Sequence, residues 1–169
     1  SLAVDGGAHV GGWTRIMSKR FQVVHAFEPA PDTFATLTKN MSGLENVRLH
    51  NVALMDKCQK GKMRLDVRST ARKFVPDSNG DVLAVTLDEF EFPSCGLIKL
   101  DLEGCDLFAL QGAIETIRRH RPFLIIELGA SLHKGLSERF GISDSDVVVW
   151  LERMGYSEVF RENVNVGYM

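Results

Sequence analysis

The sequence predicts an α/β protein with a mostly parallel, doubly wound sheet and an antiparallel hairpin near its C-terminal end. Three observations support this fold class. Short β-rich segments alternate with helical patterns, a glycine-rich turn follows the first β-rich segment, and the apolar run 123–126 lacks polar alternation. Such a run is typical of a central parallel strand that is buried on both faces.

The first quarter of the chain predicts two strand–helix units. Residues 2–4 form the first strand, and a helix is expected at 10–19 after the glycine-rich turn. The apolar residues with the spacing of one helical face are Val10, Trp13, Ile16 and Met17. A second strand at 21–27 ends before Pro29, and a proline opens the helix expected at 31–40.

The next part of the chain predicts a third strand at 47–52. Residues 54–66, broken by the turn-like sequence Gln-Lys-Gly-Lys at 59–62, are expected to form an antiparallel hairpin. The polar and small residues of 69–80 are typical of a loop.

Regular alternation returns in the second half of the chain. The elements expected there are strands at 82–86, 97–102 and 123–128, helices at 106–120 and 145–154, and a hairpin of 157–161 with 164–168. A stripe of Leu and Ile at helical spacing supports the first helix, and Ser143 is a suitable N-cap for the second. Two β-rich runs around Glu162 support the hairpin.

Composition excludes several classes of function. The 169 residues fit one domain over 1–169, and a net charge of −2 provides no global positive field for nucleic acid or an anionic membrane. Three cysteines without a CxxC pair favour a reducing, cytoplasmic compartment. No apolar run could span a bilayer, and no targeting leader opens the sequence. The composition leaves open whether the protein forms a homo-oligomer.

The glycine-rich turn predicts a ligand site, because open α/β sheets bind ligands where a strand ends and a helix begins. The turn contains Asp5, Gly6, Gly7, Ala8, His9 and Gly11. Glycine lets a ligand approach the backbone. The G-x-G-x-x-G register of dinucleotide sites is not met, whereas Asp5, Gly7 and Gly11 provide D-x-G-x-x-x-G. A turn that binds nothing is the alternative.

Glu28 follows the second expected strand and lies 21 positions after Gly7. This is close to the interval of about 20 residues at which α/β cofactor folds place a ribose-binding acid. One carboxylate can accept hydrogen bonds from both hydroxyls of a ribose. Asn51, Val52 and Ala53, at the end of the third strand, are expected to face an adenine.

Three charged residues cluster where the strand at 97–102 ends. Period-2 alternation puts Lys99, Asp101 and, if the strand extends, Glu103 on one side. Charges on a central strand are costly unless they are paired or used, so the pattern predicts a polar crevice.

The segments V-D-G-G-A-H-V-G, H-A-F-E-P-A-P, N-V-A-L, T-L-D-E-F, I-K-L-D-L-E-G-C-D and L-Q-G-A occur in this order between residues 3 and 128. Together they resemble the FkbM family of S-adenosylmethionine (SAM) dependent methyltransferases. The resemblance implies a Rossmann-like class I methyltransferase fold and SAM as cofactor. It also implies O-methylation of a hydroxyl group, often on a sugar or a polyketide-type natural product.

The resemblance also implies site residues. Asp5, Gly7 and Gly11 match the cofactor loop of the family, and Glu28 matches its ribose-binding acid. With the residues expected from the turn and the strand ends, the full set of expected cofactor-binding residues is Asp5, Gly6, Gly7, Ala8, His9, Gly11, Glu28, Asn51, Val52, Ala53 and Asp101. The active-side strand end of the family matches Lys99, Asp101, Glu103 and Gly104. The sequence departs from the family pattern at His9, where Asn is common, and at Asp106, where Glu is frequent.

The catalytic hypothesis is that Asp101 or Glu103 takes or orients the proton of the hydroxyl acceptor, while Lys99 holds the pair and moderates its charge. A salt-bridged strand end without a catalytic role is the structural alternative. A magnesium site of Asp101, Glu103 and Glu127 is a further alternative, although the sequence lacks a tight ligand cluster and no metal is expected. A non-catalytic SAM- or nucleotide-binding module and an NAD-dependent oxidoreductase remain as competing functions.

The expected partner is a small hydroxyl-bearing molecule, since the near-neutral charge favours an uncharged acceptor over a polyanion. The first expected strand begins at about Leu2, so no lid is expected before it. Acceptor specificity is therefore expected to come from residues 54–80, from residues 130–143 or from a partner chain.

Overall fold

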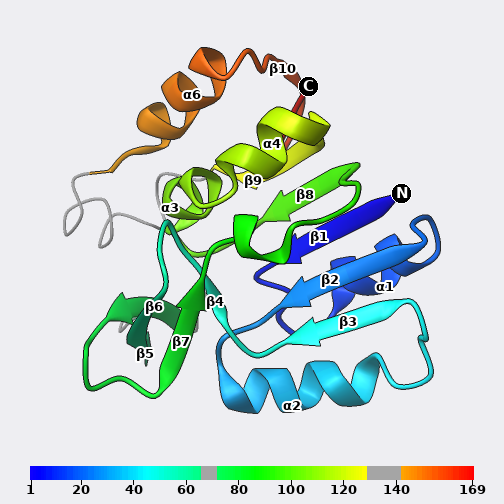
Figure 1. Ribbon diagram of the computed structural model, residues 1–169, viewed down its shortest axis with the longest axis vertical. Coiled ribbons are helices and arrows are strands. Elements are labelled where there is room, and N and C mark those ends of the chain that lie inside the picture. The colour runs from blue at the N-terminus through cyan, green and yellow to red at the C-terminus, as the bar shows by residue number, and fades with distance from the viewer. Residues whose placement is uncertain (66–71, 129–141) are drawn as a thin grey trace.

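A seven-stranded sheet forms the centre of the fold, in the strand order β10-β11-β9-β8-β1-β2-β3 (Figure 1). The computed structural model describes residues 1–65, 72–128 and 142–169. The five parallel strands are β1 (Leu2–Gly6), β2 (Val23–Phe27), β3 (Val47–His50), β8 (Leu97–Leu100) and β9 (Phe123–Glu127). Strand β11 (Asn165–Tyr168) is antiparallel to β9, and β10 (Glu158–Glu162) is antiparallel to β11. The predicted fold class and terminal hairpin are confirmed.

Helices pack on both faces of this sheet. The α1 helix (Gly12–Ser18) and the α2 helix (Pro31–Asn40) contribute buried residues to clusters with one set of strand side chains. The α3 (Asp106–Gln111), α4 (Ile114–His120) and α6 (Asp144–Arg153) helices join the main core cluster, which contains the alternate set. This division produces the doubly wound arrangement.

The central strands are buried as their sequences predict. All five residues of β1 are buried, and so are Leu124, Ile125 and Ile126 in the apolar run of β9. The predicted N-cap of α6 is also confirmed, because Ser143 and Asp146 form a capping box at its first turn. None of the helices in the described ranges combines the length and apolar character of a membrane span.

A second, four-stranded sheet lies beyond the carboxyl ends of the parallel strands. Its strands, in the order β4-β7-β5-β6, are β4 (Ala53–Leu54), β7 (Val82–Val85), β5 (Gln59–Leu65) and β6 (Arg72–Pro76). In Figure 1 the arrowheads of β1, β2, β3 and β8 point toward this sheet. Ligand sites of open α/β sheets lie at this edge, so the small sheet is placed to cover one.

The predicted hairpin over 54–66 is wrong. Residues 59–62 begin β5 instead of forming a turn, and β5 pairs with β6 and β7. This position of β5 requires glycine, because a Cβ at Gly61 would collide with the Phe74 ring. The predicted loop over 69–80 is also wrong for 72–76, which form β6; residues 69–71 lie outside the described residues.

The single helix predicted over 106–120 is divided into α3 and α4. Gly112 packs so closely on Met55 that a Cβ would collide with the Met55 carbonyl oxygen. The next helix, α4, begins just after this glycine. Its first N–H groups are capped by Asp88, which belongs to the short 3₁₀ helix η1 (Asp88–Phe90). Asp88 accepts hydrogen bonds from the N–H groups of Glu115 (3.0 Å) and Thr116 (2.8 Å).

The apolar face predicted for α1 is buried only at Met17. Val10, Trp13 and Ile16 are exposed, whereas Thr14 and Met17 are buried. The helix turns a polar residue inward because the Thr14 hydroxyl donates a 2.6 Å hydrogen bond to the carboxylate of Asp5. A buried carboxylate on β1 therefore determines which face of α1 packs on the sheet.

The contact between Asp88 and α4 generates a stability prediction. Replacing Asp88 with Ala leaves two N–H groups at the start of α4 without their acceptor, so the free energy of unfolding should fall by about 1–2 kcal/mol. Urea denaturation measures the change. Asp81→Ala, at an exposed acid nearby, is the control and should change stability by less than about 0.5 kcal/mol. Equal stability of Asp88→Ala and the control would contradict the capping role.

Candidate active site

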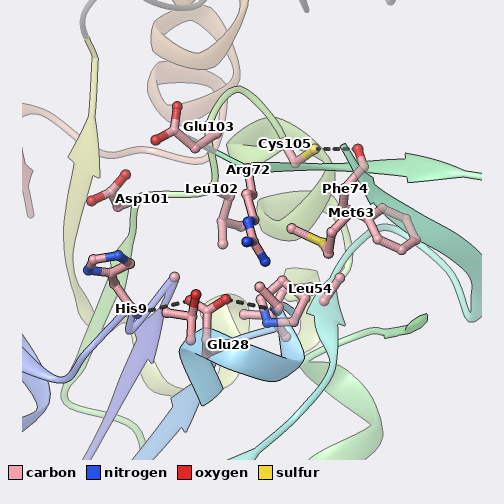
Figure 2. Close-up of a pocket in the computed structure, with 15 residues that line it drawn as sticks. His9, Glu28, Leu54, Met63, Arg72, Phe74, Asp101, Leu102, Glu103 and Cys105 are labelled. Carbon is pink, nitrogen blue, oxygen red and sulfur yellow. Dashed lines mark hydrogen bonds between the residues drawn. The ribbon is translucent and has the colours of Figure 1, made fainter. Parts of the chain in front are cut away.

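A cavity of about 560 Å³ opens between the carboxyl ends of the parallel strands and the four-stranded sheet. Figure 2 shows the side chains around it. Its lining residues are Gly7, His9, Glu28, Pro29, Ala30, Thr33, Ala53, Leu54, Met63, Arg72, Phe74, Asp101, Leu102, Glu103 and Cys105. The size falls within the range of about 300–1,000 Å³ that is common for small-molecule sites.

The loop after β1 forms one wall of this cavity. The N–H groups of Gly7 and Ala8 donate to the carbonyl oxygen of Phe27, at 3.0 and 2.9 Å, so the loop is held against the end of β2. Gly7 has a φ of 73°, and a Cβ there would collide with the Asp101 carbonyl oxygen. Glycine is thus required where this loop meets the end of β8.

His9 continues the same loop in the left-handed region, with a φ of 50°. Asn and His are among the residues that are enriched in this conformation when glycine is absent. His9 therefore suits the left-handed conformation of this loop. Figure 2 shows the imidazole at the edge of the cavity, on the same side as Asp101.

Glu28 lies at the floor of the cavity and is 7% exposed. One carboxylate oxygen accepts the N–H of His9 at 3.0 Å, and the other accepts the N–H of Ala30 at 2.9 Å. Burial raises the pKa of Glu28, and the two N–H donors oppose that rise. Each oxygen keeps a further lone pair, so the carboxylate can accept two more hydrogen bonds from a ligand.

Lys99 lies behind the cavity and is 1% exposed. Its Nζ lies 3.5 Å from Asp5 Oδ1 and 3.4 Å from Asp101 Oδ2, and it donates a 3.4 Å hydrogen bond to the Gly7 carbonyl oxygen. Asp5 is completely buried and also accepts the Thr14 hydroxyl. The ammonium group therefore ties β1, the glycine loop and the end of β8 together.

Asp101 follows the last residue of β8 and lines the cavity, with its side chain 36% exposed. Burial and a hydrogen bond with the Glu127 side chain raise the pKa of Asp101 to about 7, and the charge of Lys99 opposes that rise. A carboxyl group with a pKa near neutrality can exchange a proton at physiological pH.

Glu103 also lines the cavity, but it does not lie on an extended strand as predicted. Strand β8 ends at Leu100, and Glu103 has a φ of 54° in the turn that follows. The Asp106 carboxylate organises this turn by accepting the N–H groups of Leu102 (3.2 Å) and Gly104 (3.3 Å). Figure 2 shows Asp101 and Glu103 above the cavity and Glu28 below it.

The four-stranded sheet supplies residues that the sequence did not single out. Met63 of β5, together with Arg72 and Phe74 of β6, lines the side opposite His9 (Figure 2). The Arg72 guanidinium is 2.5 Å from a carboxylate oxygen of Asp32 on α2. Residues 54–80 were expected to contribute to acceptor specificity, so the segment was predicted. The only local signal for an individual residue is Met63, which lies between Lys62 and Arg64.

Several predicted site residues lie outside the cavity lining. These are Asp5, Gly6, Ala8, Gly11, Asn51, Val52 and Lys99. Asn51 instead supports the floor, because its Nδ2 donates to the Glu28 carbonyl oxygen at 2.8 Å. Residues 130–141 of the expected acceptor segment lie outside the described residues. In the described ranges, no three His, Cys, Asp or Glu side chains are grouped to hold a metal ion, so the proposed magnesium site has no ligand set there.

The buried Lys99 generates a second stability prediction. Lys99→Met leaves the Asp5 charge buried without its cation, so the free energy of unfolding should fall by about 3 kcal/mol or more. The double variant, Lys99→Met with Asp5→Asn, removes both charges. Its loss in free energy of unfolding should be smaller than the sum of the losses in Lys99→Met and Asp5→Asn alone. Urea denaturation of all three variants closes this thermodynamic cycle. Additive losses would show that Asp5 and Lys99 do not stabilise each other.

Comparisons with known proteins agree with this architecture. A family model described as the methyltransferase FkbM domain matches residues 5–158. Methyltransferase 1 of Beauveria bassiana (strain ARSEF 2860) is 37% identical over 83 residues, which are 48% of this chain and 30% of that protein. The chain therefore spans less than a third of this curated relative.

Solved structures resemble the whole described fold. The crystal structure of methyltransferase FkbM from Methylobacillus flagellatus KT aligns with a TM-score of 0.65 and 19% identity, over 98% of this chain and 42% of that one. A SAM dependent methyltransferase from Aquifex aeolicus aligns with a TM-score of 0.53 and 16% identity, over 99% and 81%. With the class I methyltransferase fold and a family match over most of its length, the chain belongs to the FkbM methyltransferase domain family.

Proposed function

We propose that this domain uses SAM to methylate a hydroxyl group of a small molecule such as a sugar or a polyketide-type natural product. The observation that carries the proposal is that two of the three carboxyl groups lining one cavity lie in different settings. Glu28 is held by two backbone N–H groups at the floor, and Asp101 lies above it with a pKa of about 7. The first suits a fixed hydrogen-bond acceptor, and the second suits proton transfer.

The residues around the cavity fit SAM. Glu28 would accept hydrogen bonds from the ribose hydroxyls through the lone pairs that its backbone donors leave free. The apolar side chains of Leu54, Met63 and Phe74 would contact the adenine, and the loop of Gly7 and His9 would hold the amino-acid end. When bound, SAM supplies a methyl group on a positively charged sulfur. The family match and the absence of the G-x-G-x-x-G register support the expectation of SAM over NAD.

The proton of the acceptor hydroxyl must leave as the oxygen becomes a nucleophile. We assign its removal to Asp101, which becomes a neutral carboxylic acid and later releases the proton to water. Lys99 positions this carboxyl group from behind, through its contact with Asp101 Oδ2. Glu103, on the same side of the cavity, is the second candidate for contact with the acceptor hydroxyl.

The acceptor is proposed to be small and uncharged. The cavity wall combines apolar side chains with an Arg72 whose charge is already paired with Asp32. The net charge of −2 also argues against nucleic acid and anionic membranes as partners. Cys58, Cys95 and Cys105 are free, which supports the proposal of a cytoplasmic, reducing location.

The role of Glu28 is tested by cofactor affinity. Glu28→Ala should weaken SAM binding by about ten- to one hundred-fold in isothermal titration calorimetry, because two hydrogen bonds to a carboxylate are lost. Glu45→Ala, at an exposed acid in the loop before β3, is the control and should bind SAM like the parent protein. Unchanged SAM affinity of Glu28→Ala would reject the ribose assignment. Tighter binding of NADH than of SAM by the parent protein would reject the cofactor.

The role of Asp101 is tested by turnover. A panel of sugars and polyketide-type alcohols is incubated with the protein and SAM, and formation of the demethylated cofactor and the methylated product is measured. Asp101→Asn should lower kcat by about 10²- to 10⁴-fold while SAM still binds. Binding of SAM without turnover of any hydroxyl compound would favour the non-catalytic binding module. Full turnover by a folded Asp101→Asn variant would assign the base elsewhere.

A further inference from the structure

We propose that Glu127 is a positioning residue for Asp101, and that the two carboxyl groups share one proton and work as a single acid–base unit at the end of β8 and β9. The catalytic consequence of this inference rests on the proposed function. The shared proton itself is a property of the free protein and can be measured without any substrate.

The sheet register brings the two residues together. Strands β8 and β9 are parallel neighbours, with Lys99 opposite Ile125 and Leu100 opposite Ile126. The next pair in this register is Asp101 and Glu127, and their side chains are hydrogen bonded. Two carboxyl groups form a hydrogen bond with each other only if one of them carries a proton.

The backbone holds Glu127 on both sides. It is the last residue of β9, between β8 and β11, and it pairs with Asn165 of β11. The N–H of the following residue, Leu128, donates a 2.6 Å hydrogen bond to the Val164 carbonyl oxygen. The backbone that carries Glu127 is therefore fixed beside the end of β8, within reach of Asp101.

The local charge balance explains why a proton is retained. Lys99 is the cation in contact with Asp101, and it is shared with the fully buried Asp5. Among the described residues, the ionisable groups around Asp101 are Lys99 on β8, Glu127 on β9, Asp106 on α3, Glu103 in the turn and His9 in the loop after β1. Burial disfavours the charged form of Asp101, and two adjacent carboxylates repel each other, so one proton stays on the pair.

This arrangement increases the basicity of Asp101. A carboxylate with an ordinary pKa near 4 is a weak base, whereas Glu127 helps to raise the pKa of Asp101 to about 7. Below that pH the pair holds its proton and cannot accept one from a hydroxyl. Activity should therefore rise as the pH increases through about 7. Glu127→Gln removes a negative charge, so Asp101 should ionise at lower pH and become a weaker base.

The test is ¹³C NMR titration of the side-chain carboxyl carbons in the cofactor-free protein. In the parent protein, the Asp101 and Glu127 signals should show coupled titration, with a step near pH 7. In Glu127→Gln, the Asp101 midpoint should fall by at least about one pH unit. Glu45→Gln is the control, since it removes one negative charge from an exposed position in the loop before β3 and should leave the Asp101 midpoint unchanged.

Each outcome decides the inference. Independent titration of the two carboxyl groups at ordinary values in the parent protein would overturn it, even if Glu127→Gln did not fold. An unchanged Asp101 midpoint in a folded Glu127→Gln variant would also overturn it. If an acceptor is turned over, the acid limb of the kcat profile should move to lower pH in Glu127→Gln while the Kd for SAM stays within about two-fold. Coupled titration without turnover would support the shared proton and reject only the proposed function.

Discussion

The buried ammonium group of Lys99 is the interaction on which the other site contacts depend. It touches Asp5 on β1, the carbonyl oxygen of Gly7 in the loop and Asp101 at the end of β8. The first two lie next to each other at the end of β1, whereas Asp101 is far from them in the sequence, and charge attraction at a buried position joins the two regions. The same Asp5 also selects the inward face of α1 through Thr14. The charged centre thus contributes both to the packing of one helix and to the position of the candidate base.

The acidic residues of the family motifs have two kinds of role: some stabilise the backbone, and others line the cavity. Asp88 caps α4 and Asp106 organises the turn after β8, and both use carboxylate oxygens to accept backbone N–H groups. Glu28 and Asp101 line the cavity. The mild departure from the family at Asp106 therefore concerns a turn, and its shorter side chain still reaches two N–H groups. A motif position in this fold does not by itself indicate a role in the reaction.

The sequence predicted the parallel strands and the edge of the sheet where the cavity lies, because unbroken apolar runs and the glycine turn are local signals. It did not predict the four-stranded sheet, since Gly61 resembles a turn residue until the Phe74 ring that packs against it is known. It misassigned α1 for the same reason, because the partner of Thr14 is nine residues away. Met63, Arg72 and Phe74 reach the cavity only once β5 pairs with both β6 and β7.

The four-stranded sheet has a consequence for how selectivity can change within such a domain. Its strands come from one contiguous stretch between β3 and η1, while Glu28, Lys99 and Asp101 belong to the larger sheet and the loops at its strand ends. Substitutions in that stretch can reshape one wall of the cavity without touching the charged network that positions the carboxyl groups. The shape of the cavity and the placement of its carboxyl groups are thus encoded in separable parts of the chain, so exchange of a single segment would change what fits the cavity while the charged network stays in place.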